Sequence, residues 1–169
     1  MPDALRKNNM LNIAFEANAL AAIPLKGNFK FVLTDQSGNF FVDAHATAFD
    51  AKVLNKVSIP MALVKINSGK IHSIDFHFKG NNKKASGSFL MNYENIKVDV
   101  LKRDEETKKI KKRGLFSFAA NLLVENKNSG NSVEAESDRN IYKSFFNLVW
   151  KTIFAGMKKT LGVPQSIGE

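Results

Sequence analysis

Residues 71–100, IHSIDFHFKGNNKKASGSFLMNYENIKVDV, decide the fold of this chain. Apolar and polar side chains alternate along this stretch, and a period of two is typical of β-strands that bury one face. The turn residues 80–84 separate two such runs, which indicates antiparallel neighbours joined by a short turn. The apolar side chains of this face are Ile74, Phe76, Phe78, Phe89, Met91, Ile96, Val98 and Val100.

The same alternation recurs on both sides of this stretch. Pro60 lies inside one of the runs, and because proline cannot donate to a strand ladder, that run is expected to be an edge strand, a bulge or a bend. The basic segment 102–113 has almost nothing to bury and predicts a solvated loop or a frayed hairpin. Further strands are predicted at residues 11–18, 28–34, 40–49, 57–66, 116–124 and 132–136, with turns or loops at 35–39, 67–70 and 126–131.

A helix is predicted at residues 140–161, NIYKSFFNLVWKTIFAGMKKTL, which contain no carboxylate. Ser137 and Asp138 are expected to cap its start, and Gly162 with Pro164 to end it. Such a helix must bury a wide face against a sheet, a partner or a lipid surface, and core packing and membrane-surface use are about equally supported. One arc of roughly 80° holds Lys143, Asn147, Lys151 and Lys158.

These patterns predict a mainly β fold, a curved antiparallel β-meander that forms an open groove, with a C-terminal amphipathic α-helix. The chain of 169 residues is long enough for one domain with a core. The expected organisation is a sheet region at 1–137 with a basic loop at 102–113, a helix region at 138–162 and a tail at 163–169.

The net charge of +9 favours an anionic partner, either nucleic acid or phospholipid headgroups. The absence of cysteine excludes disulfides, zinc–thiolate sites and a cysteine nucleophile. The first ten residues lack the apolar segment of a signal peptide. Lys151, near the middle of the predicted helix, would cost about 2.5–3.5 kcal/mol in a bilayer core, so a position on a membrane surface is expected rather than a span.

The three histidines, His45, His72 and His77, do not predict a metal site. Asp75 shares a strand face with His77, but the sequence identifies no third ligand, and exposed polar-face histidines are expected. The sequence has no G-x-S-x-G, P-loop, H-E-x-x-H or G-x-G-x-x-G motif. We therefore expect neither an enzyme nor a bound cofactor.

Residues 69–104, GKIHSIDFHFKGNNKKASGSFLMNYENIKVDVLKRD, resemble the penultimate strands of AsmA-like proteins of the bacterial envelope. In that family a G-K-I-x-x-[IL]-D-F strand leads to a [YF]-x-x-[IL]-K-V-x-[VL]-L-K strand. Residues 114–128 and 138–162 resemble the family's terminal strand and amphipathic helix. The matching helix positions are Lys143, Ser144, Phe145, Phe146, Trp150, Lys151, Gly156, Met157, Lys158 and Gly162.

The resemblance implies a long curved sheet with a hydrophobic concave groove. The TamB and YhdP type relatives are thought to help move phospholipid between envelope membranes, so it also implies a location on the periplasmic side of a bacterial envelope membrane. This chain departs from the family pattern, because such proteins are usually several times longer and begin with a transmembrane anchor. A C-terminal fragment or a truncated relative is expected.

The resulting hypothesis is a non-catalytic lipid-binding or lipid-transport module whose partners are phospholipid or a membrane surface, and possible envelope proteins. For the strand aromatics the default interpretation is core packing, and the alternative is contact with acyl chains. A structural protein-docking module is the second hypothesis, and nucleic-acid binding, which is not expected, is the third. The predicted groove residues are Ile74, Phe76, Phe78, Phe89, Met91, Ile96, Val98, Val100, Phe116 and Phe118. The predicted membrane-surface residues are Lys143, Phe146, Trp150, Lys151, Phe154, Lys158 and Lys159.

Overall fold

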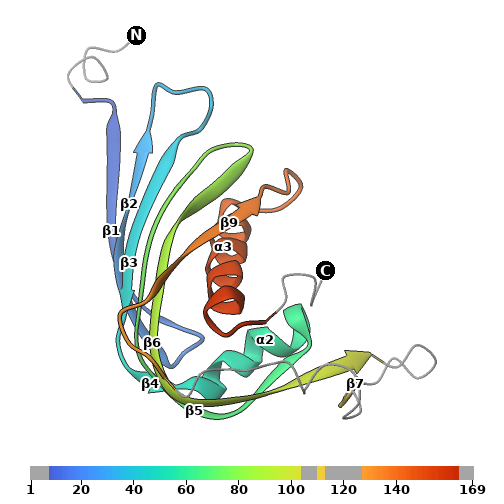
Figure 1. Cartoon of the computed structure of the whole chain (residues 1–169). Helices are drawn as coiled ribbons and strands as arrows, with labels where there is room; N and C mark the ends of the chain where they lie inside the picture. The colour runs from blue at the N-terminus through green and yellow to red at the C-terminus, as the bar shows by residue number, and fades with distance from the viewer. Residues whose placement is uncertain (1–7, 104–109, 113–126, 164–169) are drawn as a thin grey trace.

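A computed structural model of the chain describes residues 8–103, 110–112 and 127–163 (Figure 1). The fold is mainly β, an open antiparallel sheet followed by a C-terminal helix, as the sequence predicts. The structure places this helix on the concave side of the sheet (Figure 1), which the sequence left open. The predicted strand at 116–124 and most of the predicted tail lie outside the described residues.

Five antiparallel strands form the body of the sheet in the order β1-β2-β3-β5-β6. Their bounds are β1 Met10–Ala19, β2 Ile23–Val32, β3 Phe40–Ala46, β5 Val64–Gly80 and β6 Lys84–Arg103. Shorter strands extend its borders: β4 Phe49–Asp50 pairs with β5, and β7 Ile110–Lys112, β8 Lys127–Asn128 and β9 Ser132–Asp138 pair with β6. Within the described residues the outer edge of β1 has no strand partner, so the sheet stays open.

The sheet curves because β5 and β6 both bend near their middles. The turn predicted at residues 67–70 is wrong: β5 continues through it with shifts in pairing register between Ile66 and Ser73. Gly69 has φ +130°, and on the facing strand Asn95 has φ +54°. A Cβ atom at Gly69 would lie 2.6 Å from Cγ1 of Ile96, so the bend requires glycine at this point. Figure 1 shows both strands turning at this level toward β7.

The strand predicted at residues 57–66 is also wrong, because most of it is helical. A 3₁₀ turn, Ala51–Leu54, leads into α2, Asn55–Ala62, which contains Pro60. Proline lacks the N–H that a helix interior needs, and α2 ends two residues later at Ala62, with Leu63 as its C-cap at φ +52°. The side chain of Asn55 exchanges hydrogen bonds with the backbone of Ile66 at 2.7 and 2.8 Å, and so ties α2 to β5.

The C-terminal helix is shorter than predicted. It is α3, Phe145–Thr160, and its N-cap is Ser144, whose Oγ accepts a hydrogen bond from the backbone N–H of Asn147 at 3.3 Å. The predicted caps Ser137 and Asp138 belong to β9, where Ser137 pairs with Ala85. Backbone pairing with β6 therefore extends β9 past both capping residues, and residues 139–144 (the 139–144 loop) connect it to α3.

The inner face of α3 packs on β6 and β9 and forms much of the core (Figure 1). Leu148 and Met157 of α3 are buried there, and so are Phe89 and Met91 of β6. Core packing, one of the two predicted uses of the helix, is thus observed for this face.

Candidate functional site

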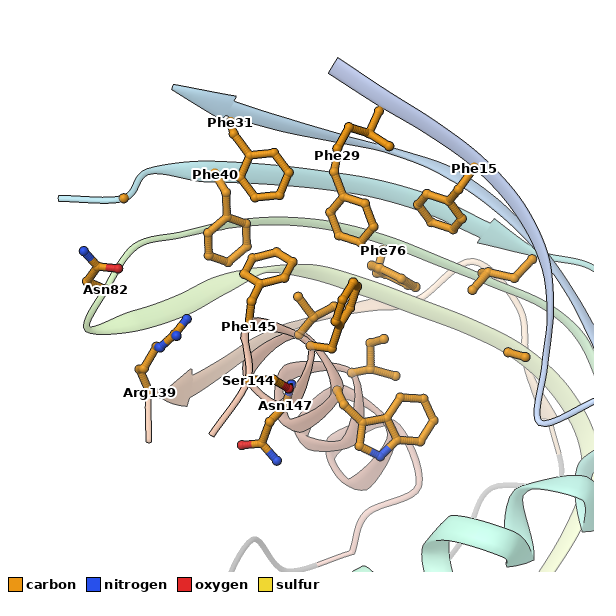
Figure 2. Close-up of a pocket in the computed structure, with 18 residues that line it drawn as sticks. Phe15, Phe29, Phe31, Phe40, Phe76, Asn82, Arg139, Ser144, Phe145 and Asn147 are labelled. Atoms are coloured by element: carbon orange, nitrogen blue, oxygen red, sulfur yellow. The ribbon is translucent and has the colours of Figure 1, made fainter. Parts of the chain in front are cut away.

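An apolar cavity of about 1060 Å³ lies between strands β1 to β3 and the N-terminal half of α3 (Figure 2). We call it the apolar cavity. Its apolar lining comes from Ile13, Phe15, Ala19, Leu25, Phe29, Phe31, Phe40, Phe76, Phe145, Phe146, Val149, Trp150 and Ile153. The remaining lining residues are Gly38, Asn82, Arg139, Ser144 and Asn147.

Phenylalanine rings form the wall of the apolar cavity. Phe29 stacks on Phe15 with 5.0 Å between ring centroids. Phe145 reaches across from α3, and its ring lies 4.7 Å from that of Phe40 and 5.6 Å from that of Phe29, both edge to face. Such aromatic pairs prefer offset or edge-to-face contact, so the rings pack against one another and offer an apolar surface to a ligand.

The polar lining residues gather at one end of the apolar cavity (Figure 2). The turn between β5 and β6 supplies Asn82, whose backbone N–H donates to the carbonyl of Ser37 at 2.9 Å. Arg139 follows β9, and its backbone N–H donates to the carbonyl of Lys83 at 2.7 Å. Ser144 and Asn147 come from the start of α3. The cavity is therefore amphipathic along its length, with polar groups and a cation at this end.

The structure places the predicted groove residues mostly elsewhere. Among those it describes, only Phe76 lines the apolar cavity. Ile74, Phe78, Phe89, Met91 and Ile96 are buried in the core, and Val98 and Val100 are half-buried. Phe116 and Phe118 lie outside the described residues.

The sequence reasoning missed the residues that form most of the cavity wall. Phe15, Phe29, Phe31 and Phe40 come from β1 to β3, and Phe145 comes from α3. The period of two at residues 11–18 and 28–34 predicts the first two of these strands. It is the sequence signal that could have marked their phenylalanines as wall residues. That period does not tell which part of the sheet the helix leaves uncovered.

The lysines of the predicted membrane surface are partly engaged with the protein itself. Nζ of Lys151 donates to the carbonyl of Asp138 at 3.2 Å, and Nζ of Lys159 donates to that of Glu134 at 2.7 Å. Both carbonyls belong to β9, so these two cations attach α3 to the sheet edge. Lys158 is half-buried.

The predicted interfacial apolar residues divide between core and surface. Phe154 is 8% exposed and packs in the core, so it does not reach a surface. Trp150 lines the apolar cavity and donates from Nε1 to Sδ of Met61 in α2 at 3.0 Å. Phe146 also lines the cavity but is 66% exposed.

An exposed apolar patch lies beside the polar end of the apolar cavity. Ile141 and Tyr142, in the 139–144 loop, are 72% and 90% exposed. Together with Phe146 they form what we call the loop patch, and the exposed cation Lys143 lies among them in sequence. Exposed large apolar side chains so close in sequence are typical of interaction surfaces.

The side chains of His45 and His77 contact aspartate side chains and do not form a metal site. Nδ1 of His45 lies 2.6 Å from Oδ1 of Asp75, and Nδ1 of His77 lies 2.8 Å from Oδ1 of Asp43. These are cross-strand pairs between β3 and β5. In the described part of the chain, no three histidine or acidic side chains are grouped so that they could hold a metal ion.

None of the protein-family models, curated proteins or solved structures compared with this chain matches it. No helix within the described residues is long and apolar enough to cross a membrane.

Proposed function

We propose that the protein binds lipid acyl chains in the apolar cavity, as a non-catalytic lipid-binding or lipid-transport module at a bacterial envelope membrane. The observation that carries the proposal is the cavity itself. Its volume of about 1060 Å³ lies just above the roughly 300–1,000 Å³ range of small-molecule sites. Aliphatic and aromatic side chains form nearly all of its lining, which favours a long apolar ligand over a polar one.

The energy of such binding comes from removing methylene groups from water. Each buried methylene contributes about 0.8 kcal/mol, so a chain that buries ten of them gains about 8 kcal/mol before ordering costs. The phenylalanine wall adds close packing, because its rings already contact one another without a ligand. Little of the gain is therefore spent on ordering the protein.

A membrane role is supported by the loop patch. Tyrosine prefers the interface between water and lipid, and each lysine near an anionic surface contributes about 1 kcal/mol. Tyr142 and Lys143 are neighbours in this loop and both are exposed. Because Lys151 and Lys159 already bind carbonyls of β9, we assign the membrane contact to the loop patch and not to the lysine face of α3.

A structural docking module is the second candidate. The outer edge of β1 has no strand partner in the described residues, and its Leu11 and Ile13 are 42% and 44% exposed. A partner strand added to this edge would extend the sheet. Nucleic-acid binding is a weaker alternative, supported only by the net charge of +9.

Trp150 is the only tryptophan of the chain and lines the apolar cavity, so its fluorescence tests the proposal directly. Phospholipid or fatty acid with bromine atoms in the acyl chain should quench this fluorescence at short range. Phe29→Glu, which places a carboxylate in the cavity wall, should abolish the quenching. Phe41→Glu is the matched control, because Phe41 is the 42% exposed neighbour of inward-facing Val42 on β3.

Circular dichroism of both variants should show an intact sheet, and lipid extracted from the purified protein should be lost only with Phe29→Glu. Absence of quenching and of extracted lipid in the unaltered protein would reject lipid binding and favour the docking module.

A further inference from the structure

The polar end of the apolar cavity carries a cation without a counter-ion. The side chain of Arg139 makes no hydrogen bond or ion pair with any residue that the structure describes, although its backbone is held by Lys83. Figure 2 shows it at the same end as Asn82 and Ser144. An arginine so placed, beside an apolar space, keeps all five of its donors available to a ligand.

Further donors lie beside it. The hydroxyl oxygen of Ser144 accepts from the N–H of Asn147, which leaves the Ser144 O–H free to donate. The side-chain amide of Asn147 makes no hydrogen bond with the described residues. Hydrogen-bond donors therefore predominate at this end, which suits an acceptor such as a carboxylate or a phosphate.

Two acids near the ends of neighbouring elements, Asp35 and Asp138, interact with other residues. The carboxylate of Asp35, in the turn between β2 and β3, accepts hydrogen bonds from Ser37 and Asn39. The carboxylate of Asp138 interacts with the charge of Lys84 on the neighbouring strand. Neither forms an ion pair with Arg139. Arg139 is the one charged side chain among the described residues that line the cavity.

We propose that the ligand is an anionic amphiphile that binds in one orientation, with its headgroup at Arg139 and its acyl chain running along Phe29 toward Phe15. This inference rests on the proposed function and adds the ligand's charge and direction to it. The recognised chemistry is a carboxylate or phosphate oxygen joined to a long chain. A fatty acid and an anionic phospholipid both carry it, whereas a neutral lipid would leave Arg139 without a role.

The test compares charged and neutral probes that have the same chain. The probes are a fatty acid brominated in mid-chain, its methyl ester and a phosphatidylglycerol with the same brominated chain, each titrated against Trp150 fluorescence at mildly alkaline pH. A hydrogen bond to a charged group is worth roughly 1.5–3 kcal/mol, which corresponds to about a tenfold to hundredfold change in affinity. The fatty acid or the phosphatidylglycerol should therefore bind at least about tenfold more tightly than the ester.

Arg139→Gln should remove this difference by weakening the anionic probe about tenfold or more and leaving the ester unchanged. Arg139→Lys should restore part of this difference in affinity, because lysine carries the positive charge but lacks the planar guanidinium that binds an anion with two hydrogen bonds. Lys79→Gln is the matched control, since it removes an exposed cation of β5 that does not line the cavity, and it should change affinity less than about twofold.

The outcomes separate the two proposals. If ester and anionic probes quench Trp150 with equal affinity, or if Arg139→Gln weakens both equally, the headgroup assignment is overturned and lipid binding stands. If no probe quenches, lipid binding itself fails. Tighter binding of the fatty acid would identify the polar end as a carboxylate site, and tighter binding of phosphatidylglycerol would identify it as a phosphate site. If inorganic phosphate displaced the lipid probe completely and bound as tightly as the probe does, the polar end would be a site for free anions and the proposal would be overturned.

Discussion

Gly156 of α3 lies directly against the ring of Phe89 on β6. A Cβ atom at Gly156 would be 2.7 Å from Cβ of Phe89 and nearer still to Cγ, and Phe89 is fully buried. The helix therefore approaches the sheet more closely at this point than any other residue would allow. The contact sets the height of α3 over the sheet, and hence the separation of Phe145 from Phe29 where the apolar cavity opens.

Gly156→Ala should lower the free energy of unfolding by about 1–3 kcal/mol. Alanine alone would favour the helix by about 1 kcal/mol, but its methyl group overlaps the ring of Phe89, which is held in the core. Urea unfolding followed by circular dichroism measures the change. The double variant Gly156→Ala with Phe89→Leu should lose less free energy of unfolding than the sum of the two single variants, because leucine leaves room for the added methyl group. A more stable Gly156→Ala protein would contradict the contact.

The bend of the sheet can be tested at Gly69 and Asn95. Gly69→Ala should destabilise the protein by about 1–3 kcal/mol, because φ is +130° and the added methyl group meets Ile96. Asn95→Gly is the matched control on the facing strand: with φ at +54°, glycine should be tolerated or should stabilise slightly. Thermal unfolding of both variants measures this. Equal losses of stability in Gly69→Ala and Asn95→Gly would show that the bulge does not depend on glycine at position 69.

The sequence predicts the strands more reliably than the points where they bend. The alternation of apolar and polar residues predicts β1, β2, β3 and the halves of β5 and β6 that flank the turn between them. It arises because each of these strands buries one face. Residues 67–70 contain asparagine, serine and glycine and therefore resemble a turn, but Gly69 uses its conformational freedom for a bulge. Pro60 was assigned to a strand because its neighbours are apolar. The tertiary contact between Asn55 and Ile66 favours helix there.

The candidate site could be predicted only in part, because it depends on distant contacts. Phe29 and Phe145 are far apart in sequence, and their meeting depends on the curvature of the sheet and on where α3 crosses it. A period of two marks Phe29 as inward-facing, but it does not distinguish a residue under the helix, such as Phe89, from one beside it. The start of α3 was misplaced for a similar reason, since Ser137 prefers strand pairing with Ala85 over a cap.

The edge of the sheet carries a pH-dependent ion pair. Nζ of Lys84 lies 2.8 Å from Oε2 of Glu136, and this hydrogen bond, with the charge of Lys84, holds the pKa of Glu136 below its usual value. A carboxylate whose pKa is lowered on folding adds stability above its unfolded pKa, and this stability is lost as the pH falls through the folded pKa.

Glu136→Gln should therefore be slightly less stable than the unaltered protein at neutral pH and equal to it in acid, where Glu136 is protonated in both states. The effect should be small and should shrink in high salt, because both side chains are exposed. Urea midpoints at the two pH values measure it. A difference that persists in acid would reject the assignment.

The membrane contact can be assigned by comparing the loop patch with the lysine face of α3. Ile141→Ser with Tyr142→Ser should reduce flotation with vesicles containing anionic phospholipid about tenfold or more, because two large apolar side chains no longer enter the interface. Lys143→Glu should reduce it further, by replacing an attractive charge with a repulsive one. Lys151→Gln with Lys159→Gln should change flotation little but lower stability, since these lysines bind carbonyls of β9. If flotation followed the second pair and ignored the first, the helix face would be the membrane surface, and α3 would have to leave β9 in order to bind.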